Sequence, residues 1–220
     1  MIGALPTVAV AFTVGITATL LTRPVLRRLP EPANGDGKPL YRDLGSTAFC
    51  LSCGVLAGAA AALSWLSLPH YVQPPWAVLA ILGVLLAAID ARTSWLPLRL
   101  TRAAWLVMAG ATVLAAFIGG GFGIALRAGA GAAIAGGLYL LVWWLSRSGF
   151  GFGDVRFAPL LGAAAAAGSW ALLWFTLLLG TVVGGLVGLL RLAQGRRGAF
   201  PYAPWMLVGA YAACTIALLT

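Results

Sequence analysis

Two of the five acidic side chains stand where a membrane protein could use them for chemistry. Asp90 closes the apolar run W-A-V-L-A-I-L-G-V-L-L-A-A-I-D, and Asp154 stands in G-F-G-F-G-D-V-R, just ahead of another apolar block. A helix from Trp76 to Asp90 would be roughly 22 Å long, against a hydrocarbon thickness of about 30 Å, so Asp90 is expected at one membrane edge or slightly inside it. The other three acidic residues fall in a polar stretch where solvation accounts for them: Glu31, Asp36 and Asp43.

Two carboxylates on separate helices can act as one catalytic pair. Close carboxylates cannot both ionise cheaply, so such a pair shares one proton. The ionised member can take a proton from water while the protonated member polarises a carbonyl, which hydrolyses a peptide bond without a metal. Ionisable groups at membrane depth are costly and therefore mark candidate functional sites. The alternative is that each carboxylate ends a helix and pairs with an arginine, for instance Asp90 with Arg92 or Arg156.

Glycines at alternate positions precede Asp154: Gly149, Gly151 and Gly153. They leave the backbone bare and permit dihedral angles that other residues avoid. This favours the catalytic hypothesis, because an extended substrate could approach the backbone closely there.

The composition indicates that transmembrane helices position these carboxylates. Of the 220 residues, 61% are hydrophobic and 9% are charged, whereas soluble proteins carry about 25% charged residues. The apolar residues run in blocks, and backbone polar groups inside lipid must be satisfied within the segment, so the blocks are expected to be helices. We predict an all-α polytopic transmembrane bundle of about eight spans, at roughly 3–22, 46–65, 75–90, 101–118, 126–146, 157–169, 170–191 and 204–219.

The positive charges indicate one orientation. If the 23–45 loop faces the cytoplasm, alternation puts thirteen of the fourteen Lys and Arg residues on that side and leaves Arg127 outside. Such asymmetry is typical of membrane proteins. Both termini would then lie outside, and Asp90 and Asp154 would share the cytoplasmic face. The net charge of +9 is thus accounted for by orientation, and no basic stretch is dense enough for a nucleic-acid arm.

Two rows of small residues at four-residue spacing predict close helix packing. The first is Gly129, Ala133 and Gly137, and the second is Gly180, Gly184 and Gly188. The 157–169 segment is short and contains Pro159, so it could instead be half of a re-entrant hairpin. The charge rule disfavours that alternative, because it would move the basic cluster at 191–197 outside.

Three segments resemble, in family order, the motifs of the type IV prepilin peptidases and preflagellin peptidases. G-F-G-D-V-R at 151–156 is similar to the GxGD motif, and D-A-R-T-S-W-L-P-L-R-L-T at 90–101 is similar to the other aspartate signature. F-P-Y-A-P-W-M-L-V-G-A at 200–210 is similar to the Pro-aromatic-small-Pro segment that leads into the last span. The resemblance covers roughly 75–215.

The resemblance implies an intramembrane aspartyl endopeptidase that cleaves the basic leader of type IV pilin-like precursors at the cytoplasmic face, after a leader glycine. It implies that Asp90 and Asp154 are the catalytic residues, with no cofactor and no metal. Leu98, Arg156 and Ala203 differ from the residues usual in the family, and none of these differences removes a carboxylate.

The N-terminal region differs more from the bifunctional members of that family. Those members carry, after the first span, a cytoplasmic domain with two Cys-x-x-Cys pairs that is associated with N-methylation, whereas the 23–45 loop here has no cysteine. Cys50 and Cys53 have that spacing inside a predicted span, and Cys214 with His70 does not convincingly complete the four ligands of a closed zinc site. We therefore predict buried thiols and no methyltransferase domain.

We predict a two-span N-terminal region over 1–74 and a catalytic membrane domain over 75–220. The protein is expected in a prokaryotic cytoplasmic (inner) membrane, with pilin-like precursors and the lipid bilayer as partners and no nucleic acid. One alternative is a transporter or pilus-assembly scaffold whose aspartates bind protons or cations, which the scarcity of polar groups within the spans disfavours. The other is a bifunctional peptidase and N-methyltransferase, which the loop without cysteine disfavours.

Overall fold

The computed structural model describes residues 4–31, 38–119, 121–146, 151–195, 198 and 200–219. Asp36 and Gly149, named above, therefore lie outside the described residues, as do three of the basic residues counted for the orientation: Arg147, Arg196 and Arg197. The elements are α1 (Ala4–Arg28), η1 (Tyr41–Leu44), α2 (Thr47–Ser67), η2 (His70–Val72), α3 (Gln73–Val78), η3 (Leu79–Gly83), α4 (Val84–Thr93), α5 (Leu98–Ile118), α6 (Gly123–Leu145), α7 (Phe152–Gly168), α8 (Trp170–Ala193) and α9 (Ala203–Leu219).

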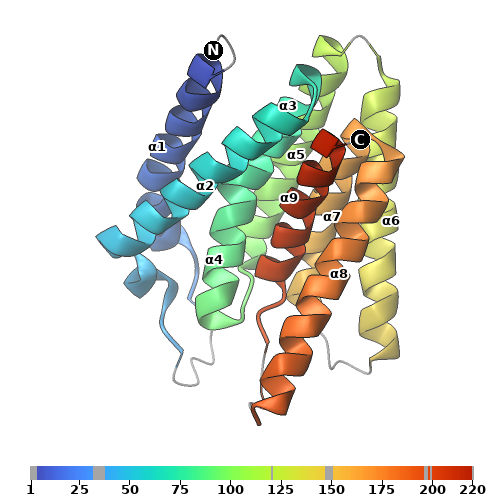
Figure 1. The fold of residues 1–220 in the computed structure, drawn as a ribbon. Helices are drawn as coiled ribbons and strands as arrows, with labels where there is room; N and C mark the ends of the chain where they lie inside the picture. Colours follow the sequence, from blue (N-terminus) through green and yellow to red (C-terminus); the bar gives the residue numbers. More distant parts are fainter. Residues whose placement is uncertain are drawn as a thin grey trace.

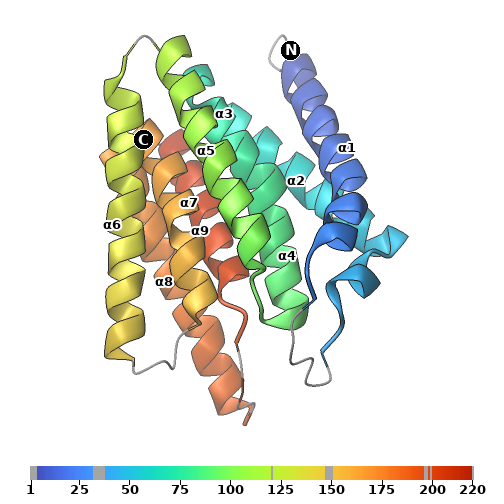
Figure 2. The same cartoon turned by 180° about the vertical axis from the view of Figure 1, so that it is seen from behind.

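The described residues form an all-α helical bundle, with no strand among them (Figures 1 and 2), which confirms the predicted fold class. The six stretches that are long and apolar enough to cross a membrane are Leu5–Arg28, Thr47–Ser67, His70–Thr93, Leu98–Ile118, Gly123–Leu145 and Trp170–Ala193. Two shorter helices, α7 and α9, complete the eight helical segments that correspond to the predicted spans. The 157–169 segment belongs to the 17-residue helix α7, which packs along the spanning helix α6, and this arrangement favours a span over half of a re-entrant hairpin.

The helices alternate in direction between two ends of the bundle. In Figure 1, α1, α4, α6 and α8 end at the lower side, and α5, α7 and α9 begin there, while the N-terminus lies at the upper side. The described basic residues follow the same division, with Arg92, Arg99 and Arg191 at lower helix ends and Arg127 near the upper start of α6. The arrangement of the helices thus agrees with the alternation derived from the charges.

Three helical segments extend at least five residues beyond the predicted spans. α1 continues through Pro24 to Arg28, whereas the prediction ended at residue 22. The third span begins at His70, because Pro74 and Pro75 occupy the first turn of α3, where a missing N–H costs no hydrogen bond. α7 begins at Phe152 rather than residue 157, which places Asp154 within its first turn.

α7 is the central helix of the bundle, and its small residues allow close packing. Nearly every residue from Phe157 to Ala167 is buried, as expected of a helix that is apolar on all sides. A Cβ added at Gly162 would collide with the Gly131 carbonyl oxygen of α6, and one at Gly131 would collide with the Gly162 carbonyl oxygen. These two glycines therefore let the α6 and α7 backbones touch.

The two predicted small-residue rows have different outcomes. The row on α6 is wrong, because a Cβ added at Gly129 or Gly137 meets no atom within 4 Å, and the packing face is instead offset by two residues, at Gly131 and Ala135. The row on α8 is confirmed: Gly180 lies against Met206 of α9, and Gly184 lies against the Tyr202 ring. Spacing alone did not identify the packing face of α6, since that helix carries small residues on several faces.

Arg127 caps the end of α7 from α6. Its Nε donates to Ala166 O at 3.1 Å, and its Nη2 donates to Ala167 O at 2.8 Å and to Gly168 O at 3.4 Å. These are terminal carbonyls without intrahelical partners, at the negative end of the helix dipole. The interaction explains why one arginine lies at the upper end of the bundle.

Candidate active site

Asp90 lies at the lower end of α4 and is 4% exposed. The helix leading to it contains a π turn over Leu79–Gly83, in which the Val84 N–H bonds Leu79 O five residues back. Such turns occur mostly as single bulges and often near functional sites. α4 ends at Ser94, which has φ 54° and donates its N–H to Asp90 O at 2.7 Å. A serine in this left-handed conformation is uncommon, so local strain lies next to the carboxylate.

Asp154 lies in the first turn of α7 and is also 4% exposed. Its Oδ1 is buried and has no hydrogen-bond partner within the described chain. A Cβ at Gly151 would approach Asp154 Oδ2 to 2.9 Å, and one at Gly153 would lie 3.1 Å from Leu96. These glycines therefore make room for the carboxylate and for packing against the α4–α5 connection. The idea that Gly153 leaves the backbone bare for a substrate is wrong, because Leu96 covers it.

The main-chain amide of Ala203 joins the two carboxylates. Its N–H donates to Asp90 Oδ2 at 3.2 Å and also interacts with the Asp154 carboxylate. Asp90 further interacts with the Tyr202 backbone, and the two carboxylates lie within electrostatic range of each other. The structure thus brings together α4, α7 and the start of α9. The sequence did not indicate the Ala203 amide, because a backbone donor carries no residue-type signal.

The arginine-pair alternative is wrong for the described residues. Among the described residues neither Asp90 nor Asp154 forms an ion pair. The ion pair that does form joins Arg42 Nε to Asp43 Oδ1 at 3.9 Å, on side chains that are 66% and 62% exposed. The Arg156 guanidinium instead lies over the Phe152 ring, 4.6 Å from its centroid. An unpaired buried charge is costly. The presence of two buried carboxylates without an arginine partner therefore requires another explanation.

Lys38 is a cation that interacts with this site. The Lys38 side chain lies within electrostatic range of Asp90, and its Nζ lies 4.8 Å from the centroid of the Trp95 ring. The Thr93 hydroxyl holds Trp95 in place, because it accepts from Trp95 N and lies 3.1 Å from Trp95 O. Sequence reasoning placed Lys38 with the orientation-setting charges and missed its approach to Asp90.

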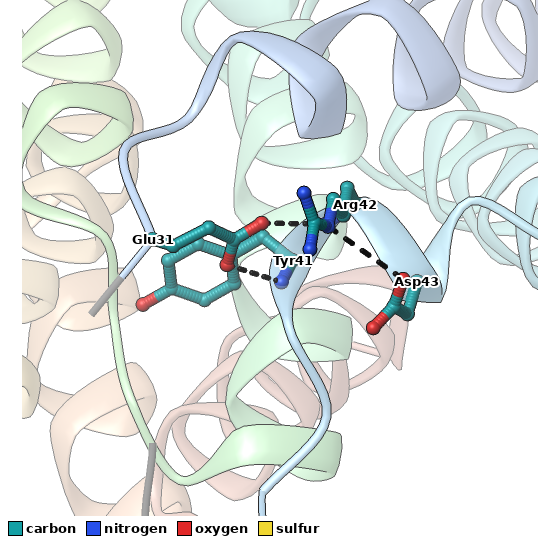
Figure 3. Close-up of polar contacts among 4 residues, drawn as sticks. All are labelled: Glu31, Tyr41, Arg42 and Asp43. Atoms are coloured by element: carbon teal, nitrogen blue, oxygen red, sulfur yellow. Dashed lines mark hydrogen bonds and ion pairs between the residues drawn. The ribbon is translucent and has the colours of Figure 1, made fainter. Parts of the chain in front are cut away.

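The loop that carries Lys38 is closed by a carboxylate. Glu31 Oε2 accepts from Tyr41 N at 2.8 Å, and Oε1 accepts from Arg42 N at 3.1 Å (Figure 3). Tyr41 is buried, and burial together with the Glu31 charge raises its pKa. Glu31, which solvation seemed sufficient to explain, therefore has a structural role on the loop.

A hydroxyl cluster borders the Asp154 side of the site. Tyr139 Oη and Thr181 Oγ1 lie 3.4 Å apart, and Tyr202 Oη donates to Thr181 O at 3.5 Å. Both tyrosines lie within electrostatic range of Asp154. The site therefore has a charged side, toward Lys38, and a neutral polar side, toward these hydroxyls.

The cysteines lie away from these groups. Cys50 and Cys53 are buried in α2, and Cys214 is buried in α9. In the part of the chain that the structure describes, no three His, Cys, Asp or Glu side chains are grouped so as to hold a metal ion.

Comparison with known proteins gives a consistent result. The model of the type IV leader peptidase family matches residues 77–189, which are 113 of the 220 residues and include Asp90 and Asp154. The chain is 38% identical over 86 residues to a prepilin leader peptidase/N-methyltransferase of Pseudomonas putida, a match that covers 34% of this chain and 29% of that protein. No solved structure matches the chain. Because the family match extends over more than half of the sequence, the chain belongs to the type IV leader peptidase family.

Proposed function

We propose that this chain is an aspartic endopeptidase that removes the short basic leader of type IV pilin-like precursors at the cytoplasmic face of a prokaryotic inner membrane, with Asp90 and Asp154 as its catalytic residues. The catalytic unit in this proposal is 75–220, and the two-span region 1–74 packs against it. The observation that carries the proposal is the Ala203 amide, which faces two buried carboxylates from α4 and α7.

In the proposed reaction one carboxylate is ionised and the other is protonated. The ionised carboxylate takes a proton from water as the water oxygen bonds to the scissile carbonyl carbon, and the protonated carboxyl gives its proton to the carbonyl oxygen. When the resulting diol collapses, the C–N bond breaks and the leaving amine takes the proton held by the first carboxyl. The diol returns one hydroxyl proton to the second carboxylate, so the pair regains its starting state.

The distribution of buried polar groups supports a peptidase over a transporter. Within the described residues, Asp90 and Asp154 are the charged side chains that are buried. The other buried polar side chains are Thr or Ser, several of which bond carbonyls of their own helix, as Thr22 does with Ala18 and Thr101 with Pro97. A transport path is expected to place further polar groups near the membrane midplane. The two buried charged side chains here lie at one end of the bundle, at the end of α4 and the start of α7.

An apolar groove gives the substrate a route from the bilayer. It has a volume of about 590 Å³ and lies between α2, α4 and α9. Its lining includes Ala91, next to Asp90, and Pro204, next to Ala203, together with Leu56, Leu63 and Leu207. An apolar precursor segment in this groove would bring the adjoining leader to the carboxylates. The methyltransferase activity in the relative's name is not part of this proposal, since the 23–45 loop has no cysteine.

The decisive experiment replaces each carboxylate by its amide isostere. Asp90→Asn and Asp154→Asn should each reduce precursor cleavage at least about 100-fold, because an amide can neither accept nor share the catalytic proton. The double variant should be no worse than either single variant, since the two groups act as a unit. The measurement is leader removal from a coexpressed pilin-like precursor in a host without its own peptidase, with membrane insertion checked for each variant.

Asp43→Asn is the matched control, because Asp43 is exposed and pairs with Arg42 on the 23–45 loop. It should cleave at the unmodified rate. If both site variants still process precursor, the aspartic mechanism is excluded and the transporter or scaffold alternative replaces it.

A further inference from the structure

We propose that Lys38 is a positioning residue of the active site, which holds Asp90 as the ionised member of the pair and thereby makes Asp154 the proton donor to the scissile carbonyl. This inference rests on the proposed function and adds to it an assignment of roles and a residue from the N-terminal region. Its basis is the unequal surroundings of the two carboxylates.

Asp90 is surrounded by groups that favour a negative charge. Its Oδ2 accepts the Ala203 N–H at 3.2 Å, and the Tyr202 backbone also interacts with it. Lys38 adds a full positive charge within electrostatic range. Hydrogen bonds to a charged group and a nearby opposite charge both stabilise the ionised form.

Asp154 has less support, because it shares the Ala203 amide with Asp90 and interacts with no described cation. Its Oδ1 is buried and makes no hydrogen bond to any described group, and its negative neighbour Asp90 disfavours a second charge. Arg156, two residues further along α7, lies over the Phe152 ring, so its sequence proximity does not make Asp154 the ionised member. A protonated carboxyl fits these surroundings best, since its O–H can be given to a substrate carbonyl that enters the site.

The position of Lys38 depends on two fixed contacts. The first is Trp95, whose ring lies 4.8 Å from Lys38 Nζ and which Thr93 holds immediately after α4. The second is indirect: the two carboxylate oxygens of Glu31 accept from the amides of Tyr41 and Arg42, which ties the segment just after Lys38 to the residues that follow α1 (Figure 3). A cation on the aromatic face keeps its charge while losing part of its freedom.

The groups that face Asp90 come from three segments, two of which contribute an ionisable side chain. Lys38 approaches from the loop between α1 and α2, and Asp154 from α7, while the segment before α9 contributes the backbone of Tyr202, whose phenol lies within electrostatic range of Asp154. Lys38 is the one cation among them, so its removal should change the ionisation of the pair more than any other neutral substitution on that loop.

The test measures kcat/KM of purified, detergent-solubilised full-length protein against pH, with a purified pilin-like precursor as substrate. The profile should be bell-shaped, with limbs that belong to the pair. Lys38→Met removes the cation, so Asp90 should gain its proton at higher pH and the acidic limb should move up by roughly 0.5–1 pH unit. Lys38→Arg keeps the charge and should keep the limb. A purely structural role would lower the whole profile without moving the limb.

A chemical test is independent of mutation, because Lys38 is the single lysine of the chain. Acetylation of amines should move the acidic limb as Lys38→Met does, whereas reductive methylation, which keeps the charge, should not. The Lys38→Arg variant treated with the same acetylating reagent should keep its limb, which excludes an effect of the N-terminal amine.

Arg42→Gln is the control for net charge, because it removes one exposed cation from the same loop, and it should leave the limb in place. An unmoved limb in Lys38→Met, or an equal movement in Arg42→Gln, would overturn the role of Lys38. Both results would leave the proposed function intact if Asp90→Asn and Asp154→Asn are inactive. Active aspartate variants would instead overturn the proposed function itself.

Discussion

At the scale of single residues, the site depends on a group that no side chain provides. The Ala203 amide donates to Asp90 Oδ2 at 3.2 Å and also interacts with Asp154. A donor shared between two carboxylates lowers the cost of keeping them close, because it faces the single negative charge wherever that charge resides. Its position at the start of α9 leaves its N–H free of intrahelical bonding.

Two substitutions at this position separate the amide from the side chain. Ala203→Pro removes the N–H, and a hydrogen bond to a charged group contributes about 1.5–3 kcal/mol, so kcat/KM should fall roughly ten- to hundredfold. Ala203→Gly keeps the N–H and should stay within about threefold of the unmodified protein. Thermal stability measured on both variants separates lost catalysis from lost folding. Equal activity in the two variants would show that the Ala203 amide does not contribute to catalysis.

The sequence was sufficient to find both carboxylates but not their neighbours. Asp90 and Asp154 stand out because a charge beside an apolar run is rare, and that signal is local. Lys38 precedes Asp90 by 52 positions and Ala203 follows it by 113, and neither type of group is unusual where it occurs in the sequence. Their contribution arises only from tertiary contact.

At the scale of helices, the α6–α7 contact holds Asp154 in place. Gly131 and Gly162 let the two backbones touch, while Trp105 Nε1 of α5 donates to Arg156 O at 3.0 Å on the first turns of α7. The α7 helix is thus fixed from α6 and from α5, and the α5 contact lies two residues from Asp154. Dispersion contacts and interhelical hydrogen bonds are the forces available for this inside a bilayer.

A pair of glycines on α6 tests this contact. Gly131→Ala would push a methyl group into Gly162 of α7, and overpacking of this kind costs about 1–3 kcal/mol. The apparent melting temperature should fall by roughly 2–12 °C. Gly129→Ala, on the same helix, meets open space and should leave the melting temperature unchanged. Thermal unfolding of both in one detergent is the measurement, and a larger loss in Gly129→Ala would refute this packing.

Helix existence was predictable, while helix detail was not. The apolar blocks indicated eight segments, because burial in lipid demands a length and composition that can be read locally. The π turn at Leu79–Gly83 and the left-handed Ser94 follow from packing around α4 and have no distinctive residue pattern. The packing face of α6 was also missed, for the same reason.

At the scale of the whole molecule, the two predicted regions are not independent in the site. The family match begins at residue 77, yet Lys38 reaches Asp90 from the region 1–74. α1 and α2 pack against each other, and α2 also packs against α4 and α9. We expect the catalytic unit to require both regions for its normal pH dependence.

The alternation of the helices predicts a topology that labelling can check. Single cysteines at Arg42, Gln194 and Phe122, in a background without Cys50, Cys53 and Cys214, all lie at exposed positions. An impermeant thiol reagent should label position 122 in intact cells and positions 42 and 194 only after lysis. Labelling at 42 or 194 without lysis would place the carboxylates on the outer side of the membrane.

The order of the site groups along the chain has a consequence for biosynthesis. Both aspartates are translated and inserted before residue 203, which supplies the amide that faces them, leaves the ribosome. A nascent chain that ends within α8 therefore holds the two acids without the donor that joins them. Under the proposed function, proteolytic competence begins only when α9 has docked, so the nascent protease would stay inactive until the last of the three segments that form its site is in place.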